Sequence, residues 1–352
     1  MDDIKKKSKE ELMQSLKPPG AYLDSLSGFT DILGTIKQAE NAAKELLDET
    51  SSPVKAVKTG SKAPQEQETQ IEEAVENEKT TEELLEILDA LIGLENIKQS
   101  VKSLINYVKV RELREENKLP NPPMSLHMVF TGNPGTGKTT VARILSELYK
   151  AIGVLSKGQL VEVDRSGLVA GFVGQTALKT SEVVTSALGG ILFIDEAYAL
   201  APDTGTGNDF GREAIETLLK LMEDNRDDLI IIVAGYNEPM ERFISSNPGL
   251  ESRFNRYFFF EDYNEKELYD IFNIMCLKSE YILTDDAKDF AREFFREIYE
   301  NRDENFGNAR HVRNFFENIV SVHSDRVSTL DGHTRDDLTM VIREDLEKAA
   351  AL

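Results

Sequence analysis

The most informative segment of this chain is Gly132-Asn133-Pro134-Gly135-Thr136-Gly137-Lys138-Thr139, which fits the pattern G-x-x-x-x-G-K-[ST]. It follows a predicted strand over residues 126–131 and opens a predicted helix over residues 139–151. Glycines let consecutive backbone N–H groups curl around phosphate oxygens at the positive end of such a helix. The Lys138 amine would reach the β- and γ-phosphates of a nucleotide, and the Thr139 hydroxyl would bind Mg²⁺. The segment therefore predicts phosphate binding, against the plainer interpretation as a glycine-rich strand–helix turn.

Short apolar segments alternate with helical patterns from residue 126 to residue 263. The run Ile230-Ile231-Ile232-Val233 has no polar alternation, which is typical of a strand buried on both faces. Such alternation of strands and helices predicts a parallel sheet and an α/β fold class. After Tyr263 only helical patterns remain, and they predict a second, all-α domain. The expected strands of the five-stranded sheet cover residues 126–131, 159–164, 191–195, 229–235 and 256–260, and further helices are expected over residues 211–224, 285–299 and 309–322.

The N-terminal part of the chain differs from the rest in composition. Apolar residues at helical spacing between Phe29 and Leu47 predict one amphipathic helix. The following residues are rich in Pro, Ser, Lys and Gln and then in Glu, which predicts a disordered acidic linker. A capping-box pattern at Thr80-Thr81-Glu82-Glu83 predicts that a helix begins there. The expected domains are a helical extension (1–50), the linker (51–79), an α/β nucleotide-binding domain (80–263) and a helical lid domain (264–352).

Composition excludes several classes of protein. The 41 basic and 63 acidic side chains give a net charge of −22, which repels phosphate backbones and makes nucleic acid an unexpected partner. The single cysteine, Cys276, lies in an apolar run and is expected to be a core residue in a reducing cytosol. The first thirty residues lack the apolar region and cleavage site of a signal peptide. The longest apolar stretch, 229–234, is far shorter than the roughly 20 residues that span a bilayer. We therefore expect a soluble, cytoplasmic protein without a membrane partner.

A second motif places two acids at the end of an apolar strand, in Ile191-Leu192-Phe193-Ile194-Asp195-Glu196. Asp195 can position Mg²⁺ through its water shell. Glu196 can accept the proton of an attacking water, a role typically worth about 10²–10⁴-fold. The alternative is a helix N-cap followed by a first-turn acid. Because a phosphate-binding loop precedes the pair, hydrolysis is the better interpretation.

Three further polar residues are candidates for the same site. Asn237 follows the run Ile232-Val233-Ala234-Gly235-Tyr236, where it could orient the lytic water or simply cap a helix. Arg253 lies beside a Pro-Gly turn, where it could act as an arginine finger or form a surface salt bridge. In the helical domain Arg310 opens a helix within Gly307-Asn308-Ala309-Arg310 and could fold over the nucleotide, with Arg313 as its rival.

Taken in order, these motifs resemble the AAA+ ATPases over residues 84–346. Within that family the chain is most similar to the group containing stage V sporulation protein K and the red-type Rubisco activase. Residues 1–80 lie outside the resemblance. The segments that carry it are Leu91-Ile92-Gly93-Leu94, Phe193-Ile194-Asp195-Glu196-Ala197-Tyr198, Ala234-Gly235-Tyr236, Asn247-Pro248-Gly249-Leu250-Glu251-Ser252-Arg253 and Gly307-Asn308-Ala309-Arg310.

The resemblance implies a role for each matching residue. Asp195 and Glu196 correspond to the Walker B acids, Asn237 to sensor 1, Arg253 to the arginine finger and Arg310 to sensor 2. Ile92 and Gly93 would line the adenine pocket. The cofactors implied are ATP and Mg²⁺, with Thr139 and Asp195 on the metal. The expected ATP contacts are Ile92, Gly93, Asn133, Pro134, Gly135, Thr136, Gly137, Lys138, Thr139, Thr140 and Arg310.

The resemblance also implies how the chain acts on a partner. Members of this family form homo-oligomeric rings, here expected to be hexamers, and pull protein substrates through a pore lined by an aromatic residue. Phe172, between glycines in Ala170-Gly171-Phe172-Val173-Gly174, matches that residue, although a Phe in this setting is more often buried in the core. One departure is Gln175, which stands where the activase tends to have His.

The sequence therefore predicts an ATP-hydrolysing ring that remodels or threads a protein substrate. The alternative is an ATP-switched scaffold or loader in which hydrolysis only resets assembly, and whose target could be nucleic acid. The net charge of −22 and the absence of Lys and Arg next to Phe172 favour the first hypothesis.

Overall fold

The computed structural model describes residues 79–122, 125–172, 174–201 and 210–352. The predicted N-terminal helix and nearly all of the predicted acidic linker lie outside these residues. Residues Leu84–Leu352 form one compact unit. The predicted capping box is confirmed: the Thr80 N–H donates to Glu83 Oε2 and the Glu83 N–H to Thr80 Oγ1, at 2.8 and 3.2 Å. Helix α3 (Thr81–Asp89) begins at this box and is followed by α4 (Glu95–Glu116).

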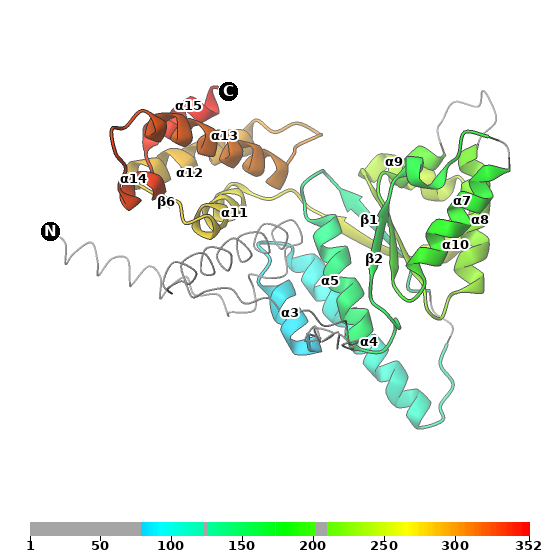
Figure 1. Cartoon of the computed structure of the whole chain (residues 1–352). Helices are drawn as coiled ribbons and strands as arrows, with labels where there is room; N and C mark the ends of the chain where they lie inside the picture. The colour runs from blue at the N-terminus through cyan, green and yellow to red at the C-terminus, as the bar shows by residue number, and fades with distance from the viewer. Residues whose placement is uncertain (1–78, 123–124, 173, 202–209) are drawn as a thin grey trace, which may run out of the picture. The chain divides into compact units, whose positions relative to one another are not determined.

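A five-stranded parallel sheet forms the centre of the nucleotide domain (Figure 1), as predicted. Its strand order is β2-β3-β4-β1-β5. Strands β2, β3 and β4 therefore lie side by side in chain order, whereas the connections from β1 to β2 and from β4 to β5 pass over other strands. Met128 of β1 is paired with Ile232 of β4 on one side and with Arg256 of β5 on the other. The strands are β1 (Met128–Gly132), β2 (Leu160–Val163), β3 (Ile191–Ile194), β4 (Ile230–Gly235) and β5 (Arg256–Phe260).

Helices cover both faces of the sheet, which explains why the central strands β1, β3 and β4 are buried at every position. Within β1, Phe130 belongs to the core on the side of α4 and α5 (Lys138–Ala151), while Val129 belongs to the core on the opposite side. The opposite face is covered by α7 (Gln175–Ala187), α8 (Phe210–Asp224), α9 (Asn237–Ser245) and α10 (Pro248–Arg253). Two short elements, α6 (Arg165–Leu168) and the 3₁₀ turn η2 (Ala197–Leu200), complete this side.

The C-terminal domain is a helical lid packed around aromatic rings. Phe272 lies 5.4 Å from Phe295 and 5.6 Å from Phe315, measured between ring centroids. Cys276 is buried in the same core, as predicted, and burial raises its pKa to about 12, so the thiol stays protonated. The lid helices are α11 (Glu265–Lys278), α12 (Asp285–Glu300), α13 (Ala309–Ser328), α14 (Arg335–Thr339) and α15 (Arg343–Ala350).

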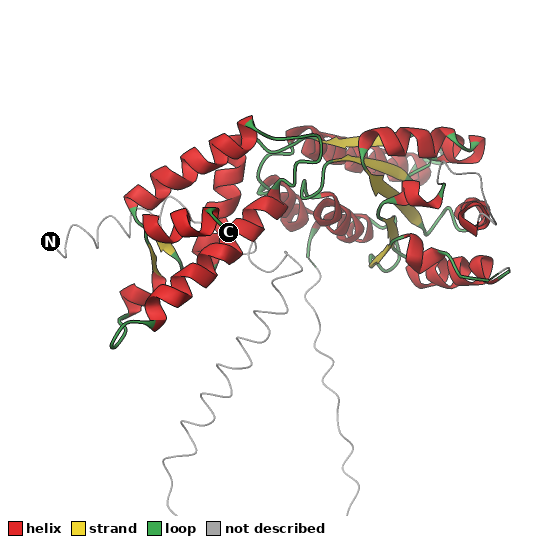
Figure 2. Ribbon diagram, turned by 90° about the horizontal axis from the view of Figure 1, so that it is seen from above, coloured by secondary structure: helices red, strands yellow, loops and turns green. Residues whose placement is uncertain are grey.

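The expectation that the domain after Tyr263 contains only helices needs one correction. Two short strands, β6 (Ile282–Leu283) and β7 (Met340–Val341), pair in parallel within the lid (Figure 2). Two-residue strands carry no hydrophobic alternation, so periodicity could not reveal them. They fasten the segment between α11 and α12 to the segment between α14 and α15.

A buried histidine joins β1 to β4 at the start of the sheet. His127 is 5% exposed, and its Nδ1 accepts the backbone N–H of Ile231 at 2.9 Å. Burial, and secondarily the positive charge of Arg253, lowers the pKa of His127 from 6.5 to about 4. The imidazole is therefore neutral at physiological pH, which leaves Nδ1 free to accept this hydrogen bond.

This pKa makes stability depend on pH in a defined direction. The unfolded state takes up the proton near pH 6.5 and the folded state only near pH 4, so stability is lost as pH falls between these values. We expect the free energy of unfolding to drop by about 2 kcal/mol between pH 7 and pH 5 through this residue alone. Urea denaturation of His127→Asn, which keeps an acceptor near the Ile231 N–H but cannot titrate, should lack this component. The exposed His333→Asn serves as the control and should retain the full pH dependence.

Candidate active site

The predicted phosphate-binding loop lies between β1 and α5, at the carboxyl end of the sheet. Gly135 and Gly137 have φ angles of +73° and +91°, which residues with a side chain rarely adopt. A Cβ at Gly135 would lie 2.3 Å from the carbonyl oxygen of Gly307 in the lid, so glycine is also required by close packing. Buried Thr136 braces the loop by donating its hydroxyl to the Asn133 carbonyl at 2.8 Å.

Lys138 lies inside this loop. Its Nζ donates to the carbonyl oxygens of Gly132 and Asn133, both at 2.8 Å. Burial lowers the pKa of Lys138 to about 8; the charge of Arg310 adds to this, while the carboxylates of Asp195 and Asp262 oppose it. The amine therefore still carries its charge at neutral pH. A partly desolvated ammonium at this position suits a polyphosphate, which would restore its charge partners.

The first turn of α5 fits the phosphate end of a nucleotide. The helix begins at Lys138, its N-cap is Gly137, and no side chain caps it. Its first backbone N–H groups and positive dipole end are therefore available to an anion. Thr139 and Thr140 are half-buried in this turn. No cluster of three His, Cys, Asp or Glu side chains within the described residues could hold a metal by itself, so Mg²⁺ would depend on nucleotide oxygens, as is usual for this ion.

The acid pair lies where β3 ends. The Asp195 N–H continues the sheet by donating to the Val163 carbonyl at 2.8 Å, and its carboxylate accepts the Glu196 N–H at 3.0 Å. Glu196 has φ +48° and ψ +41°, a left-handed conformation that is uncommon for a residue with a side chain. Such backbone strain concentrates at functional sites. Both acids are exposed, and the negative charge of Asp195 raises the pKa of Lys138, against the effect of burial.

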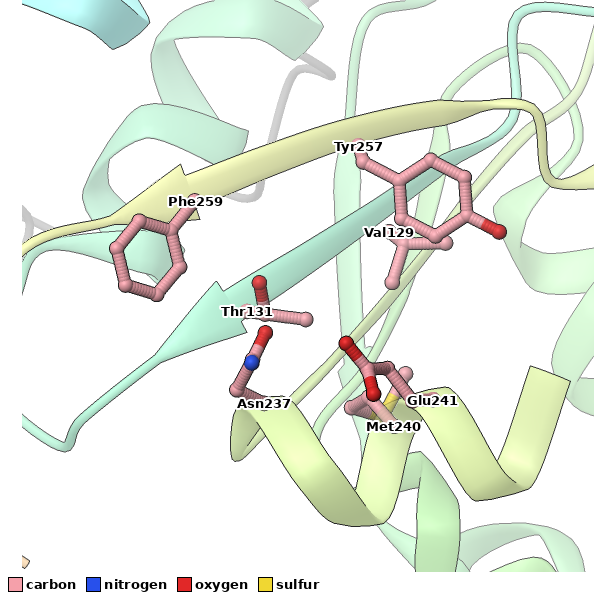
Figure 3. Close-up of a pocket in the computed structure, with 7 residues that line it drawn as sticks. All are labelled: Val129, Thr131, Asn237, Met240, Glu241, Tyr257 and Phe259. Carbon is pink, nitrogen blue, oxygen red and sulfur yellow. The ribbon is translucent and has the colours of Figure 1, made fainter. Parts of the chain in front are cut away.

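Asn237 is exposed at the end of β4, where it begins α9. The N-cap of α9 is Tyr236, and no side chain caps the helix, so the alternative role of Asn237 as a helix cap is wrong. Figure 3 shows its amide pointing toward the Thr131 side chain at the end of β1. The two residues line a cavity of about 400 Å³ that also includes Tyr257 and Phe259 of β5. The amide is thus presented at the edge of the sheet that carries the phosphate-binding loop.

The lid brings Arg310 to the same region. Arg310 is exposed in the first turn of α13, and its charge lowers the pKa of Lys138, which places the two cations within electrostatic range. Arg313 is also exposed, but no such effect links it to Lys138, and this favours Arg310 over its rival. Ile92 and Gly93 lie just before α4, and a Cβ at Gly93 would contact Glu267 of the lid at 2.5 Å.

Sequence reasoning missed Asp262, which lies between the phosphate-binding loop and the lid. Its carboxylate accepts the Asn133 side-chain amide at 3.0 and 3.2 Å and the Asn308 amide at 2.7 Å. The available signal was its position: like Asp195 and Asn237, Asp262 follows a strand of the parallel sheet.

Arg253 does not join this group. It ends α10 before β5, at the edge of the sheet opposite the phosphate-binding loop. Its guanidinium is 29% exposed and donates to Glu223 Oε2 at 3.4 Å and to the Gly249 carbonyl at 3.3 Å. It lines a cavity of about 700 Å³ together with Tyr107 and His127. Within one subunit Arg253 therefore forms a salt bridge with Glu223, which was the alternative to an arginine finger.

Phe172 is exposed, and the expectation from composition that such a Phe is buried is wrong. The side chain is 72% exposed. A Cβ at the flanking Gly171 or Gly174 would meet no described atom within 4 Å, so neither glycine is required there by close packing against the described residues. The Phe172 carbonyl accepts the N–H of Gln175 at the start of α7.

Together the loop, the acid pair and the lid define a P-loop nucleotide-binding protein. Residues 128–262 match the family described as "ATPase family associated with various cellular activities (AAA)", and residues 264–351 match the "AAA lid domain". The chain is 38% identical over 293 residues to stage V sporulation protein K of Bacillus subtilis, covering 83% of this chain and 90% of that protein. The chain therefore belongs to the AAA ATPase family.

Two other relatives are similar to this chain, one named as an activase and the other named protein CbbX. Ribulose bisphosphate carboxylase/oxygenase activase, chloroplastic, of Cyanidioschyzon merolae is 41% identical over 272 residues, covering 76% of this chain and 92% of the relative. Protein CbbX of Cereibacter sphaeroides is 43% identical over 249 residues, covering 70% of this chain and 79% of the relative. The chain is thus an AAA ATPase of the type that includes these proteins and the sporulation protein.

Solved structures support the fold. The AAA domain of FIGL-1 superposes with a TM-score of 0.52 at 17% identity, covering 75% of this chain and 82% of that one. A mutant of Thermotoga maritima RuvB gives a TM-score of 0.50 at 19% identity, covering 75% and 71%. Separately, none of the helices in the described ranges is long and apolar enough to cross a membrane.

The site makes a prediction about Glu196. In Glu196→Gln the amide keeps a hydrogen-bonding group but cannot take a proton, so ATP should bind while turnover falls by about 10²-fold or more. Calorimetry and phosphate release measure the two effects separately. Lys138→Ala is the contrasting variant and should lose ATP binding itself, because it removes the charge that faces the phosphates. Simultaneous loss of binding and turnover in Glu196→Gln would indicate a structural role instead.

Proposed function

We propose that this chain hydrolyses ATP to ADP and phosphate in a homo-oligomeric ring, with six subunits as the expected number, and uses the energy to remodel or thread a protein substrate. The observation that carries the proposal is the distribution of side chains over the sheet. Lys138, Asp195, Glu196 and Asn237 gather at one edge, whereas Arg253 lies at the opposite edge. One subunit would therefore hold most of an ATPase site at one edge of its sheet, while Arg253, the cation that this site lacks, lies at the opposite edge.

The residues of the first edge suit hydrolysis. Lys138 would face the β- and γ-phosphates, Glu196 would accept the proton of the attacking water, and Asn237 would orient that water. Arg310 would add positive charge from the lid of the same subunit. Mg²⁺, held by Thr139 and through water by Asp195, would screen the phosphate charges. Ile92 and Gly93, which lie just before α4, would contact the adenine, and Gly93 already packs closely against Glu267 of the lid.

Arg253 supports the ring because it lies away from the phosphate-binding loop of its own subunit. Gly132 at the end of β1 is paired with Phe260 of β5, whereas Arg253 precedes the start of β5 at Arg256. Strands rise about 3.3 Å per residue, so the strand alone separates the two edges by about 13 Å. A neighbouring subunit that presents this edge would complete the site with an arginine finger, worth about 10³–10⁵-fold in related chemistry.

Phe172 supports a protein substrate. An exposed aromatic ring can grip an unfolded chain by apolar contact. The sequence on either side of it, residues 166–178, contains no Lys or Arg to attract nucleic acid. One relative is named as an activase of ribulose bisphosphate carboxylase/oxygenase. We do not assign that enzyme as the substrate of this chain, because Gln175 departs from the activase pattern. A cytoplasmic location remains part of the proposal.

The role of Phe172 can be tested before any substrate is known. Phe172→Ala should shift the melting temperature by less than about 2 °C, because the side chain is exposed. Phe193→Ala, a buried control from β3, should cost about 3–5 kcal/mol. Basal ATPase activity should survive in Phe172→Ala. Proteins that the Glu196→Gln variant captures should no longer be captured by the double variant Phe172→Ala/Glu196→Gln. Capture that persists without Phe172 would favour the alternative, an ATP-switched scaffold or loader.

Mixing two inactive variants tests whether the site is shared. Arg253→Ala should bind ATP but hydrolyse it about 10³-fold more slowly, and Lys138→Ala should not bind it. In a mixed ring, an Arg253→Ala subunit keeps its phosphate-binding loop and can receive a finger from a Lys138→Ala neighbour. Mixing should therefore restore part of the turnover, measured as phosphate release.

The control for this experiment is Arg212→Ala, which removes an exposed arginine paired with Glu216 on α8 and should leave turnover unchanged. Native mass spectrometry must first establish that mixed rings form in these samples. Mixed rings without recovery would show that Arg253 acts within its own subunit or only structurally. Turnover that does not depend on concentration down to a monomer would exclude the ring.

A further inference from the structure

The contact between the phosphate-binding loop and the lid passes through three side chains. Asn133 belongs to the loop, Asp262 to the segment after β5, and Asn308 to the segment that opens α13. The Asp262 carboxylate accepts one amide from each side, at 3.0 Å from Asn133 and 2.7 Å from Asn308. Its negative charge is therefore placed between the two parts and hydrogen-bonded to both.

Asn308 is the fixed end of this connection. It is fully buried, with φ +48° and ψ −127°, a conformation that a residue with a side chain adopts only when its surroundings impose it. Its Oδ1 accepts the backbone N–H of Tyr263 at 2.8 Å, and Tyr263 lies in the short segment between β5 and α11 where the chain enters the lid. The Asn308 side chain thus holds both Asp262 and the backbone of the segment that enters the lid.

The loop also contacts the lid through its backbone. The Ala309 N–H donates to the Gly135 carbonyl at 3.2 Å, and the Asn308 amide lies 3.4 Å from the Pro134 carbonyl. The first turn of α13 therefore rests on the phosphate-binding loop. These contacts do not involve Asp262, so the nucleotide effect on the lid that remains in an Asp262 variant measures their share of the coupling.

Lys138 provides the link to the nucleotide. Its Nζ donates to the backbone carbonyl of Asn133, the residue whose side chain donates to Asp262. An ammonium that turns toward phosphate oxygens must weaken its bonds to Gly132 and Asn133. Asn133 would then move, and Asp262 would pass that movement to Asn308. Asp262 itself bears a negative charge and is unsuited to contact phosphate, so its role is to position the others.

We propose that Asp262 is the positioning residue that couples the nucleotide at the phosphate-binding loop to the lid, through Asn133 on one side and Asn308 on the other. This inference rests on the proposed function, since it requires that the loop bind ATP. By linkage, a lid held through Asp262 affects nucleotide affinity as much as the nucleotide affects the lid, and couplings of this kind typically amount to about 5–150-fold.

Hydrogen exchange on the full chain tests the coupling without relying on activity. Exchange is measured with no nucleotide, with Mg-ADP and with a non-hydrolysable ATP analogue. In the parent, nucleotide should slow exchange both in the loop and in the segment from Phe306 to Phe315. In Asp262→Asn the loop should still be protected, while the nucleotide effect on the lid segment should shrink by about 5-fold or more.

Two further variants make the result specific. Glu261→Gln removes the neighbouring, exposed carboxylate and should keep both responses. Asn133→Ala removes the amide on the loop side but leaves the Asp262–Asn308 and Tyr263 contacts, so it should uncouple the lid even if Asp262→Asn folds poorly. Melting temperatures establish that each variant is folded.

The outcomes separate the two ideas. If the parent binds nucleotide and its lid responds, an equal lid response in Asp262→Asn and Asn133→Ala overturns the coupling and leaves the ATPase proposal intact. A parent whose loop is protected but whose lid does not respond also overturns it. If calorimetry and exchange detect no nucleotide in the parent at all, the proposed function fails, and the coupling fails with it.

Discussion

Parallel pairing of five strands is the constraint on which the rest of this structure depends. Because β1, β3, β4 and β5 all run in one direction, the residues that follow them meet at one edge of the sheet. Asp195, Asn237 and Asp262 each follow such a strand, and the phosphate-binding loop follows β1. Ligands of open α/β sheets bind at this edge for the same reason. Residues that precede strands, such as Arg253, are placed at the other edge by the same pairing.

Much of this arrangement could be predicted from the sequence, because it depends on local patterns. Strands buried on both faces are continuous apolar runs, and the run at Ile230–Val233 in β4 is an example. The edge strands β2 and β5 are partly exposed, yet they too lie where the sequence placed them. The glycines of the loop and the acids after β3 likewise form short contiguous motifs. Their predicted roles in catalysis remain predictions, whereas their gathering at one edge is a feature of the fold.

The parts that could not be predicted depend on pairs far apart in the chain. Asp262 contacts Asn133 across 129 residues and Asn308 across 46, and no periodic pattern marks such contacts. The same holds for Glu223, which approaches Arg253 from a different helix. The exposure of Phe172 depends on how much space surrounds its loop, since the same Gly-Phe sequence is compatible with a core position. Composition alone favoured the wrong choice there.

Electrostatics at the site differ from those of the chain as a whole. The net charge of the chain is −22, yet Lys138 of the loop and Arg310 of the lid lie close enough for the charge of Arg310 to lower the pKa of Lys138. Two cations brought together without a ligand repel each other, and the carboxylates of Asp195 and Asp262 only partly offset this. A polyphosphate would relieve the repulsion, and because Arg310 belongs to the lid, this would favour a lid held close to the loop. The proposed requirement for Arg253 of a neighbour then separates two events: binding needs only the loop and its own lid, whereas hydrolysis waits for a second subunit.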